Sequence, residues 1–278
     1  MTLSGRAKLA GVMGWPVSHS LSPRLHGFWL ERHGIDGAYV PLPVRPQDFG
    51  SAVRSLADLG FRGVNVTLPH KEAALAACDE IDPTAARIGA VNTIRFQDGR
   101  LLGSNSDAFG FVENLNQGAS GWDAAKAPAV VLGAGGAARA VVWALVATGL
   151  SEIRLVNRTV ARAEALKDAI GGPITVHGWD QAAATLGDAG LLVNTTSLGM
   201  TGQGPLDLDL DSLPAAAVVT DLVYNPLETA LLAQARARGH RCVDGLGMLL
   251  HQARPGFESW FGVRPAVDAA LRDFVLAA

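Results

Sequence analysis

The sequence predicts an α/β protein of two domains, and three observations support this prediction. Short apolar runs alternate with segments of helical periodicity along most of the 278 residues, which is typical of folds built on a parallel sheet. A glycine-rich turn at residues 133–138 joins one apolar run to an alanine-rich helical segment. The length, together with a hydrophobic content of 49%, suffices for two buried cores. We therefore expect two α/β domains, the first with a mostly parallel sheet.

The first domain begins with a strand, a loop rich in hydroxyl groups and a helix. Residues 9–13 form a short apolar run, and the loop that follows leads to Ser22 and Pro23. We expect Ser22 to be the N-cap and Pro23 the first helical residue, with Gly34 ending the helix. Further elements of this domain are expected as strands at residues 39–42 and 64–66 and a helix at residues 46–59.

Ser20 and Ser22 lie where this loop meets the helix, and their hydroxyl groups allow two interpretations. The simpler one is that they only cap the helix. The other is that two hydroxyl groups at a helix N-terminus bind a carboxylate without any arginine, because the helix dipole and the free N–H groups favour an anion there. The local sequence leaves both interpretations open.

Polar side chains follow the third strand at residues 65–71, at the carboxyl edge where open α/β sheets hold their ligands. Lys71 falls in the first turn of the next helix, where the dipole disfavours a cation and eases the loss of its proton. An exposed lysine with no special role is the alternative. No metal-ligand spacing connects His19, His26 and His70, so we expect packing or capping roles for them and no metal site.

A β-hairpin follows, with strands at residues 90–96 and 101–102 around an Asp-Gly turn. We expect this hairpin to form an antiparallel edge of the sheet, with Asn92 inside its first strand. Asp107 comes after the hairpin at the start of a helix, which its side chain can cap.

The domain boundary is expected between residue 110 and the polar loop that follows the next helix. The first domain then begins with residues 1–110, and the second comprises residues 111–245. The segment 246–278 is too long to be a minor extension, so we expect its helices to return and complete the first domain. Gln252 would then lie near the cleft between the domains, and a solvent-facing glutamine is the alternative.

The glycine turn is the central motif of the second domain. Gly133 can adopt the backbone angles of a sharp turn, Gly135 places no Cβ between the backbone and a pyrophosphate, and Ala138 is small enough for close packing of helix on strand. The phosphates of a dinucleotide would lie at the helix N-terminus. The pattern predicts a Rossmann-like domain, although an ordinary strand-to-helix turn is the alternative. The candidate cofactor-binding residues of the turn are Gly133, Ala134, Gly135, Gly136 and Ala137.

The strand expected at residues 153–156 ends without the carboxylate that would hold the ribose 2′-hydroxyl of NAD. It runs instead into Asn157, Arg158 and Thr159, with Arg162 one turn later. A guanidinium suits the 2′-phosphate of NADP, because arginine binds phosphate through charge-assisted and often bidentate hydrogen bonds. We therefore expect NADP as the cofactor, and a solvated charge cluster that caps a helix is the alternative.

Three more strands with polar ends are expected in the remainder of the second domain. They lie within residues 191–200, 218–226 and 242–248. The last of them leads into the helix that carries Gln252.

The composition indicates which kind of partner the protein binds and in which cellular compartment it occurs. The formal net charge is -3 and the basic residues form no run, so we expect a small-molecule substrate and neither nucleic acid nor a membrane as partner. Cys78 and Cys242 lie far apart without C-x-x-C spacing, which fits a reducing compartment and no disulfide framework. Residues 1–14 are interrupted by glycines and lack the continuous apolar core of a signal peptide. We expect a cytoplasmic protein.

Eight short motifs run nearly end to end along the chain. They are residues 18–23 (SHSLSP), 65–71 (NVTLPHK), 89–93 (GAVNT), 105–107 (NSD), 157–159 (NRT), 194–200 (NTTSLGM), 221–226 (DLVYNP) and 245–252 (GLGMLLHQ). Together with the glycine turn, these motifs and their order resemble those of the shikimate dehydrogenase family.

The resemblance implies the NADP-dependent, reversible reduction of 3-dehydroshikimate to shikimate, a step of aromatic amino-acid biosynthesis. It also implies that Ser20 and Ser22 hold the substrate carboxylate and that Lys71 works with Asp107 at the reacting oxygen. Tyr224 would border the substrate. The residues that would bind the substrate hydroxyl groups are Thr67, Asn92, Asp107 and Gln252, and those beside the nicotinamide are Leu222 and Gly245.

Three positions depart from the family pattern and leave the fine specificity for the substrate open. They are Ser106, where threonine is usual, Ala253, where glycine is common, and Trp15, where a small polar residue is frequent. One alternative is a quinate/shikimate dehydrogenase that uses NAD, against which Arg158 argues. Another is a non-catalytic binding protein on the same fold, against which the presence of both Lys71 and Asp107 argues. We expect a monomer or a homodimer.

Overall fold

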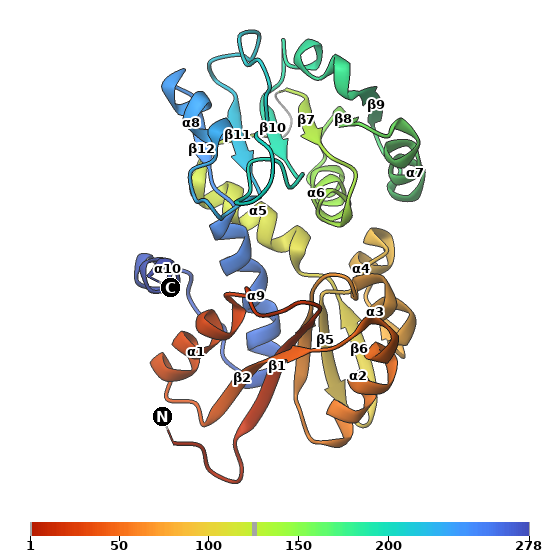
Figure 1. Cartoon of the computed structure of the whole chain (residues 1–278), viewed down its shortest axis with the longest axis vertical. Coiled ribbons are helices and arrows are strands. Elements are labelled where there is room, and N and C mark those ends of the chain that lie inside the picture. Colours follow the sequence, from red (N-terminus) through yellow and green to blue (C-terminus); the bar gives the residue numbers. More distant parts are fainter. Residues whose placement is uncertain (1, 124–126, 278) are drawn as a thin grey trace. The chain divides into compact units, whose positions relative to one another are not determined.

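The computed structural model describes residues 2–123 and 127–277, which form two compact units. Unit 1 combines the chain up to Ser106 with the chain from Leu250 onward, and unit 2 is Asp107–Leu249. The predicted divisions at residues 110 and 245 lie within a few residues of these borders. Figure 1 shows one sheet in each unit, with red to yellow strands in the first and yellow-green to blue strands in the second.

The sheet of unit 1 has six strands. They are β1 (Lys8–Gly14), β2 (Gly37–Pro43), β3 (Gly63–Val66), β4 (Glu80–Ile81), β5 (Thr93–Gln97) and β6 (Arg100–Ser104), in the order β2-β1-β3-β5-β6-β4. Strand β1 pairs in parallel with β2 and β3, and β4 pairs in parallel with β6, whereas β5 is antiparallel to both of its neighbours. The sheet is mostly parallel, as predicted.

Two predictions for the hairpin β5–β6 are wrong. The hairpin is not the edge of the sheet, because the two-residue strand β4 pairs with the outer side of β6. Asn92 immediately precedes β5 instead of lying inside it. Its backbone nevertheless forms hydrogen bonds with β3 and β6. Its N–H donates to the carbonyl of Ser104 at 3.1 Å, and its carbonyl accepts from the N–H of Val66 at 2.8 Å.

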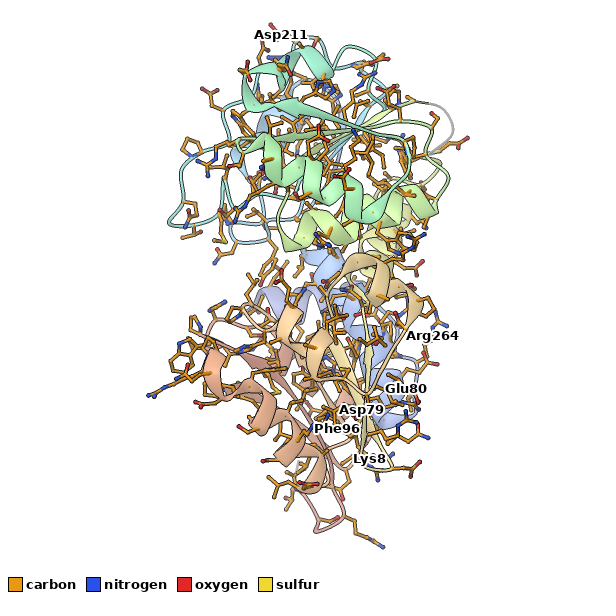
Figure 2. All side chains as sticks on the ribbon, turned by 90° about the vertical axis from the view of Figure 1, so that its right-hand side faces the viewer. Lys8, Asp79, Glu80, Phe96, Asp211 and Arg264 are labelled. Carbon is orange, nitrogen blue, oxygen red and sulfur yellow. The ribbon has the colours of Figure 1, made fainter. Side chains whose placement is uncertain are left out.

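Charged side chains surround the short edge strand β4 (Figure 2). The Asp79 carboxylate accepts hydrogen bonds from the Arg54 guanidinium at 3.1 Å and from the N–H of Leu101 at 2.7 Å, and these bonds hold its pKa below the usual value. Glu80 forms an ion pair with Arg100 at 2.5 Å. A short edge strand flanked by charges disfavours pairing with the sheet of another molecule.

Most helices of unit 1 pack on this sheet, whereas the last helix packs on the first one. They are α1 (Ser22–Arg32), α2 (Phe49–Asp58) after a single 3-10 turn (Pro46–Asp48), α3 (Lys71–Ala77), α4 (Pro83–Ile88), α9 (Leu246–Phe261), which begins in unit 2, and α10 (Ala269–Leu276). The chain from Leu250 onward, with most of α9 and all of α10, belongs to unit 1. On α9, the indole N–H of Trp260 donates to the carbonyl of Ile94 at 3.2 Å, and a Cβ at Gly63 would lie 2.1 Å from the same indole nitrogen.

Unit 2 is built on six parallel strands in the order β12-β11-β10-β7-β8-β9. The strands are β7 (Ala129–Leu132), β8 (Ile153–Asn157), β9 (Ile174–Gly178), β10 (Leu191–Asn194), β11 (Val218–Asp221) and β12 (Arg241–Val243). The helices are α5 (Asp107–Gly118), α6 (Gly136–Ala147), α7 (Val160–Ile170) and α8 (Ala230–Ala237). This parallel α/β architecture confirms the Rossmann-like prediction, and only β9 among these strands is absent from the predicted elements.

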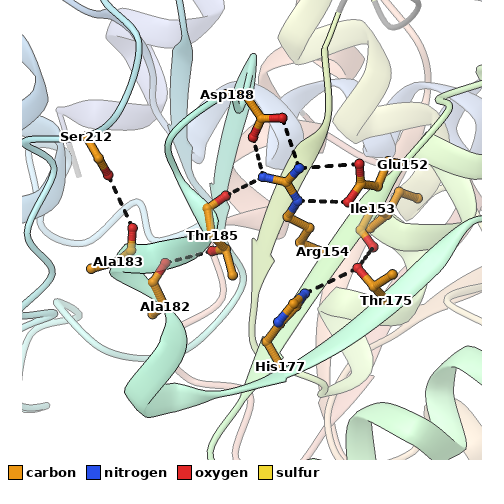
Figure 3. Close-up of polar contacts among 10 residues, drawn as sticks. All are labelled: Glu152, Ile153, Arg154, Thr175, His177, Ala182, Ala183, Thr185, Asp188 and Ser212. Atoms are coloured by element: carbon orange, nitrogen blue, oxygen red, sulfur yellow. Dashed lines mark hydrogen bonds and ion pairs between the residues drawn. The ribbon is translucent and has the colours of Figure 1, made fainter.

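Arg154, the second residue of β8, connects the sheet of unit 2 to the loop that precedes β10 (Figure 3). Its guanidinium donates to Glu152 at 2.8 Å, to Asp188 at 2.5 Å and to the carbonyl of Thr185 at 2.7 Å. Bonding between opposite charges raises the pKa of Arg154 and lowers that of Asp188. The cluster joins residues that none of the predicted sites includes.

Among residues 2–123 and 127–277, no helix is long and apolar enough to cross a membrane. The same residues contain no group of three or more His, Cys, Asp and Glu side chains placed to hold a metal ion.

Candidate active site

Two loops at the carboxyl ends of β1 and β3 lie against each other in unit 1. The N–H of Thr67, the residue after β3, donates to the carbonyl of Met13 at 2.9 Å. The N–H of Trp15 donates to the carbonyl of Leu68 at 3.1 Å. These bonds bring the serine-rich loop next to the loop that ends at Lys71, at the edge where the sequence predicts a ligand.

Ser20 and Ser22 lie at the start of α1, but Ser22 is not the N-cap. Leu21 occupies that position because its backbone already has helical angles (φ -81°, ψ -7°), and it makes no side-chain capping bond. The hydroxyl of Ser20 instead accepts a hydrogen bond from the N–H of Ser22 at 3.3 Å, which satisfies one of the free N–H groups of the helix start. Ser22 is buried and Ser20 is partly buried.

Lys71 is the first residue of α3 and is partly buried. Its position in the first helical turn is the predicted one. The carbonyl of Lys71 accepts a hydrogen bond from the N–H of Val91 at 3.0 Å, which places the start of the helix beside the segment that carries Asn92. Unit 1 therefore brings together the loops of Ser20, Thr67, Lys71 and Asn92.

A buried network of amide and hydroxyl groups lies behind Asn92. The hydroxyl of Tyr39 donates to the amide oxygen of Asn65 at 2.7 Å, and the amide nitrogen of Asn65 donates to the hydroxyl of Thr93 at 3.1 Å. The amide oxygen of Asn92 accepts from the hydroxyl of Thr93 and from the N–H of Ser106, both at 2.9 Å. The network fixes the orientation of the Asn92 side chain.

Four members of this network are absent from the predicted site, namely Tyr39, Asn65, Thr93 and Ser106. One signal in the sequence could have found Asn65, which interrupts an otherwise apolar strand whose residues are all buried. A buried amide needs hydrogen-bond partners, and polar neighbours on adjacent strands are the nearest source. The partners themselves depend on strand pairing, which the sequence does not display.

Two buried histidines of unit 1 are packing residues, as predicted. His26 stacks on Tyr39 with ring centres 3.8 Å apart, and neither ring nitrogen has a hydrogen-bond partner among the described residues. Complete burial lowers the pKa of His26 to about 3, so its ring is neutral near pH 7. His70 stacks on Phe49, and its Nε2 lies 2.8 Å from the carbonyl oxygen of Val44.

The glycine turn of unit 2 has the predicted geometry. Gly133 follows β7 with a φ of +103°, and a Cβ there would lie 2.8 Å from the hydroxyl of Thr195. Glycine is therefore required both by the backbone angle and by the close approach. Ala138 on α6 is fully buried. At Gly135 a Cβ would meet no described atom within 4 Å, so the space in front of the turn is open.

The carboxyl end of β8 carries the predicted cationic segment. The Asn157 amide donates to the carbonyl of Thr159 at 2.8 Å, and the N–H of Arg162 donates to the same carbonyl at 3.0 Å. The side chains of Arg158 and Arg162 are exposed, and the ion pairs found in the described part of the chain include neither. Both guanidinium groups are thus available to an anionic ligand.

Leu222 and Gly245 lie in contact in unit 2. A Cβ at Gly245 would lie 2.3 Å from the carbonyl oxygen of Leu222, so any other residue there would displace the backbone just after β11. Tyr224, two residues after Leu222, is partly buried, and burial raises the pKa of its phenol. The structure thus brings together the two residues that the sequence analysis associates with a nicotinamide.

Asp107 and Gln252 lie at the borders of the two units. Asp107 is the buried first residue of α5 and of unit 2, and it follows Ser106 directly in the chain. Gln252 lies on the part of α9 that belongs to unit 1 and is partly buried. The pairing of Asp107 with Lys71 and the position of Gln252 at a cleft remain predictions.

Family models match the chain in three segments. Residues 12–94 match the shikimate dehydrogenase substrate binding domain. Residues 115–199 match the shikimate / quinate 5-dehydrogenase model, and residues 245–272 match the shikimate 5′-dehydrogenase C-terminal domain.

Relatives and solved structures extend this likeness over the full length. A protein of Rhodospirillum rubrum named shikimate dehydrogenase (NADP(+)) is 63% identical, with 99% of each chain covered. The shikimate 5-dehydrogenase of Thermus thermophilus, solved with NADP(H) and shikimate, is 39% identical with a TM-score of 0.87 over 97% of this chain and 99% of the other. The quinate dehydrogenase of Corynebacterium glutamicum, solved with NAD, is 30% identical with a TM-score of 0.92 over 98% and 99%.

Proposed function

Because the chain belongs to the shikimate dehydrogenase family, we propose that it catalyses the NADP-dependent, reversible reduction of 3-dehydroshikimate to shikimate. The observation that supports this most strongly is identity of 63% over 99% of both chains with a relative named for that activity. Within the family, the reaction is a step of aromatic amino-acid biosynthesis. We further propose that the protein acts in the cytoplasm on this small molecule, as a monomer or a homodimer and without a nucleic-acid partner.

The cofactor site that we propose lies along the carboxyl edge of the sheet in unit 2. The turn Gly133–Ala137 holds the pyrophosphate, and the open space at Gly135 suits the close approach of phosphate to backbone N–H groups. The guanidinium groups of Arg158 and Arg162 bind the 2′-phosphate, with Asn157 and Thr159 shaping the loop. Leu222 and Gly245 flank the nicotinamide. When bound, the cofactor would supply the hydride as NADPH in the reduction and accept it as NADP⁺ in the oxidation.

The substrate site that we propose lies on the loops of unit 1. Ser20 and Ser22 bind the carboxylate of the substrate at the start of α1. The substrate hydroxyl groups hydrogen-bond to Thr67, Asn92, Asp107 and Gln252, and Tyr224 borders the ring. The buried network behind Asn92 supports this assignment, because it fixes that side chain before the substrate arrives.

Lys71 and Asp107 are the proposed acid-base pair at the reacting oxygen. Lys71 exchanges the proton with the reacting oxygen, and Asp107 works with it there. Hydrogen bonds hold the chain next to each residue: the N–H of Ser106, which precedes Asp107, donates to Asn92, and the N–H of Val91 donates to the carbonyl of Lys71.

A quinate dehydrogenase solved in complex with NAD has the same fold, so the fold alone does not determine the cofactor. The end of β8 favours NADP, because it offers Arg158 and no carboxylate for a ribose 2′-hydroxyl. The presence of Lys71 and Asp107 favours an enzyme over a non-catalytic protein.

The test of the proposal is a spectrophotometric assay of the purified protein. NADPH and 3-dehydroshikimate are mixed with the protein, and the loss of reduced-nicotinamide absorbance is followed. The same protein is assayed in the oxidative direction with shikimate and NADP and with quinate and NAD. Turnover with shikimate and NADP exceeding that with quinate and NAD supports the proposal. Faster turnover of quinate with NAD would establish the alternative, and no turnover with any pair would favour a non-catalytic protein.

A further inference from the structure

A carboxylate is completely buried at the end of β11, in the sheet of unit 2. Asp221 is the last residue of this strand and has no exposed surface. Its Oδ2 accepts a hydrogen bond from the Thr229 hydroxyl at 2.7 Å. Its Oδ1 accepts one from the amide nitrogen of Asn194 at 2.9 Å and one from the N–H of Val223 at 3.0 Å. Burial raises the pKa of this carboxyl, and the three bonds oppose that effect.

Asn194 extends this bonding toward the glycine turn. Its amide oxygen accepts from the N–H of Thr196 at 3.0 Å and from the Thr196 hydroxyl at 2.7 Å, and its amide nitrogen also donates to the carbonyl of Leu198 at 3.2 Å. The loop held in this way packs on Gly133, where a Cβ would lie 2.9 Å from the methyl group of Thr196. The carboxylate is therefore connected to the turn through one asparagine.

A second set of hydrogen bonds holds the segment that follows β11. The N–H of Leu222 donates to the carbonyl of Asn194 at 3.0 Å, and Val223 bonds directly to the carboxylate. Gly245 packs against the carbonyl of Leu222. Asp221 thus fixes two backbone segments, residues 195–198 and 222–223, that lie side by side at the carboxyl edge of the sheet.

We propose that Asp221 is a positioning residue for the nicotinamide half of the cofactor. The inference rests on the proposed function, which places Leu222 and Gly245 beside the nicotinamide. Asp221 does not touch the cofactor. It holds residues 195–198 and 222–223 in one arrangement. A buried carboxylate must keep its hydrogen-bond donors, and any other arrangement of these segments would leave it without them.

A purely structural role predicts something different. The Thr229 hydroxyl also accepts from the N–H of Leu232 at 3.3 Å, so Asp221 supports the N-cap of α8 as well. If that support were its whole purpose, its loss would lower stability and would affect every ligand of unit 2 alike. Positioning of the nicotinamide half predicts a loss confined to ligands that contain the nicotinamide.

The experiment compares two ligands that share the adenosine with its 2′- and 5′-phosphates, whereas only NADPH carries the second phosphate and the nicotinamide riboside. Dissociation constants for NADPH and for adenosine 2′,5′-bisphosphate are measured by calorimetry in the parent, in Asp221→Asn and in Asp221→Ala. Asn keeps the shape and one acceptor oxygen, whereas Ala removes the bonds to both segments. Asp188→Asn is the matched control, because it removes a carboxylate charge from the Arg154 cluster of the same unit (Figure 3).

Asp221→Ala removes all three hydrogen bonds to the carboxylate. We expect it to weaken NADPH binding by about tenfold or more, while the bisphosphate binds as in the parent. Asp221→Asn should give a smaller loss of the same kind, and Asp188→Asn none. Equal weakening of both ligands, unchanged NADPH affinity in folded Asp221→Ala, or failure of both Asp221 variants to fold would each overturn the proposal. A parent protein that binds NADPH but does not turn over 3-dehydroshikimate would refute the proposed function alone.

Discussion

Lys71 carries the one side-chain amine among the residues proposed to surround the substrate. General acid-base catalysis contributes typically 10²–10⁴-fold, so we expect Lys71→Ala to lower kcat by about that factor while KM for shikimate changes far less. Asp107→Asn should reduce both rate and binding, because the carboxylate is also proposed to bind a substrate hydroxyl.

Steady-state kinetics with shikimate and NADP measure these effects. Circular dichroism and the affinity for NADPH serve as controls, since they report misfolding and damage to unit 2. A folded Lys71→Ala protein with near-parental kcat would show that another group carries the proton.

Arg158 is exposed at the end of β8 with no ion pair in the described residues. A hydrogen bond between charged groups contributes about 1.5–3 kcal/mol, so Arg158→Ala should reduce the preference for NADP over NAD by roughly 10- to 100-fold. The measurement is the ratio of kcat/KM for the two cofactors.

Arg238→Ala is the matched control for Arg158, because this guanidinium lies in the same unit and already pairs with Asp211 at 2.6 Å. It should leave the cofactor ratio unchanged. The same ratio in the parent and in Arg158→Ala would place the discrimination in other residues, with Arg162 the first to examine.

Helix α1 and strand β2 meet through the stacked rings of His26 and Tyr39. The pKa of His26 falls from 6.5 to about 3 on folding because the ring is buried. The unfolded chain therefore binds a proton that the folded one rejects, and stability that is fully present above pH 6.5 is lost as the pH falls toward 3. The loss should amount to about 1.4 kcal/mol per pH unit in the middle of this window.

His26→Phe removes this titration and keeps an aromatic ring against Tyr39. We expect its free energy of unfolding in urea to fall less steeply between pH 4 and 6 than that of the parent. His33→Gln, at an exposed residue just after α1, is the control and should follow the parent curve. Parallel curves for the parent and His26→Phe would mean that the acid sensitivity arises from other groups.

The sequence predicts best those elements whose conformation is determined by neighbouring residues in the chain. The turn at Gly133 needs a positive φ and a close approach, and Lys71 opens a helix directly after a strand, so a few neighbouring residues determine each. The end of β8 is equally local, since Arg158 follows the strand without an intervening loop. The amino-acid sequence alone therefore suffices to predict their geometry.

What the sequence does not display is which strand ends face one another. Tyr39 bonds to Asn65 across 26 positions and Asn65 to Thr93 across 28, so this network exists only once β1, β2, β3 and β5 have paired. The edge position of β4 depends on the same pairing, and two residues are too few to show periodicity. The N-cap prediction for Ser22 is wrong for a local reason. The backbone of Leu21 already has helical angles, so Leu21 is the N-cap.

The two units should respond separately to the two ligands, because the proposed cofactor site lies in unit 2 and most of the substrate site in unit 1. NADPH at about 100 times its Kd stabilises the form that binds it by about 2.7 kcal/mol. We expect this ligand alone to slow amide hydrogen exchange in β7, β10 and β11 more than in β1, β2 and β3. Shikimate alone should do the reverse.

Hydrogen exchange followed by mass spectrometry measures both responses on the same protein. Adenosine 2′,5′-bisphosphate is the control, because it should protect only the part of unit 2 around Arg158. Equal protection of both units by NADPH alone would contradict independent responses and would point to one cooperative unit.

The hydrogen bond between Trp260 and the carbonyl of Ile94 has a consequence for folding during synthesis. On the ribosome, residues 1–106 emerge while α9 has not yet been made, and the 154 residues from 107 to 260 must follow. At about 5–20 residues per second, this takes roughly 8–30 s. For that time the sheet surface at Gly63 lacks its indole cover, so the half of the protein that is translated first is the half that matures last. A nascent-chain chaperone would find its exposed apolar surface there.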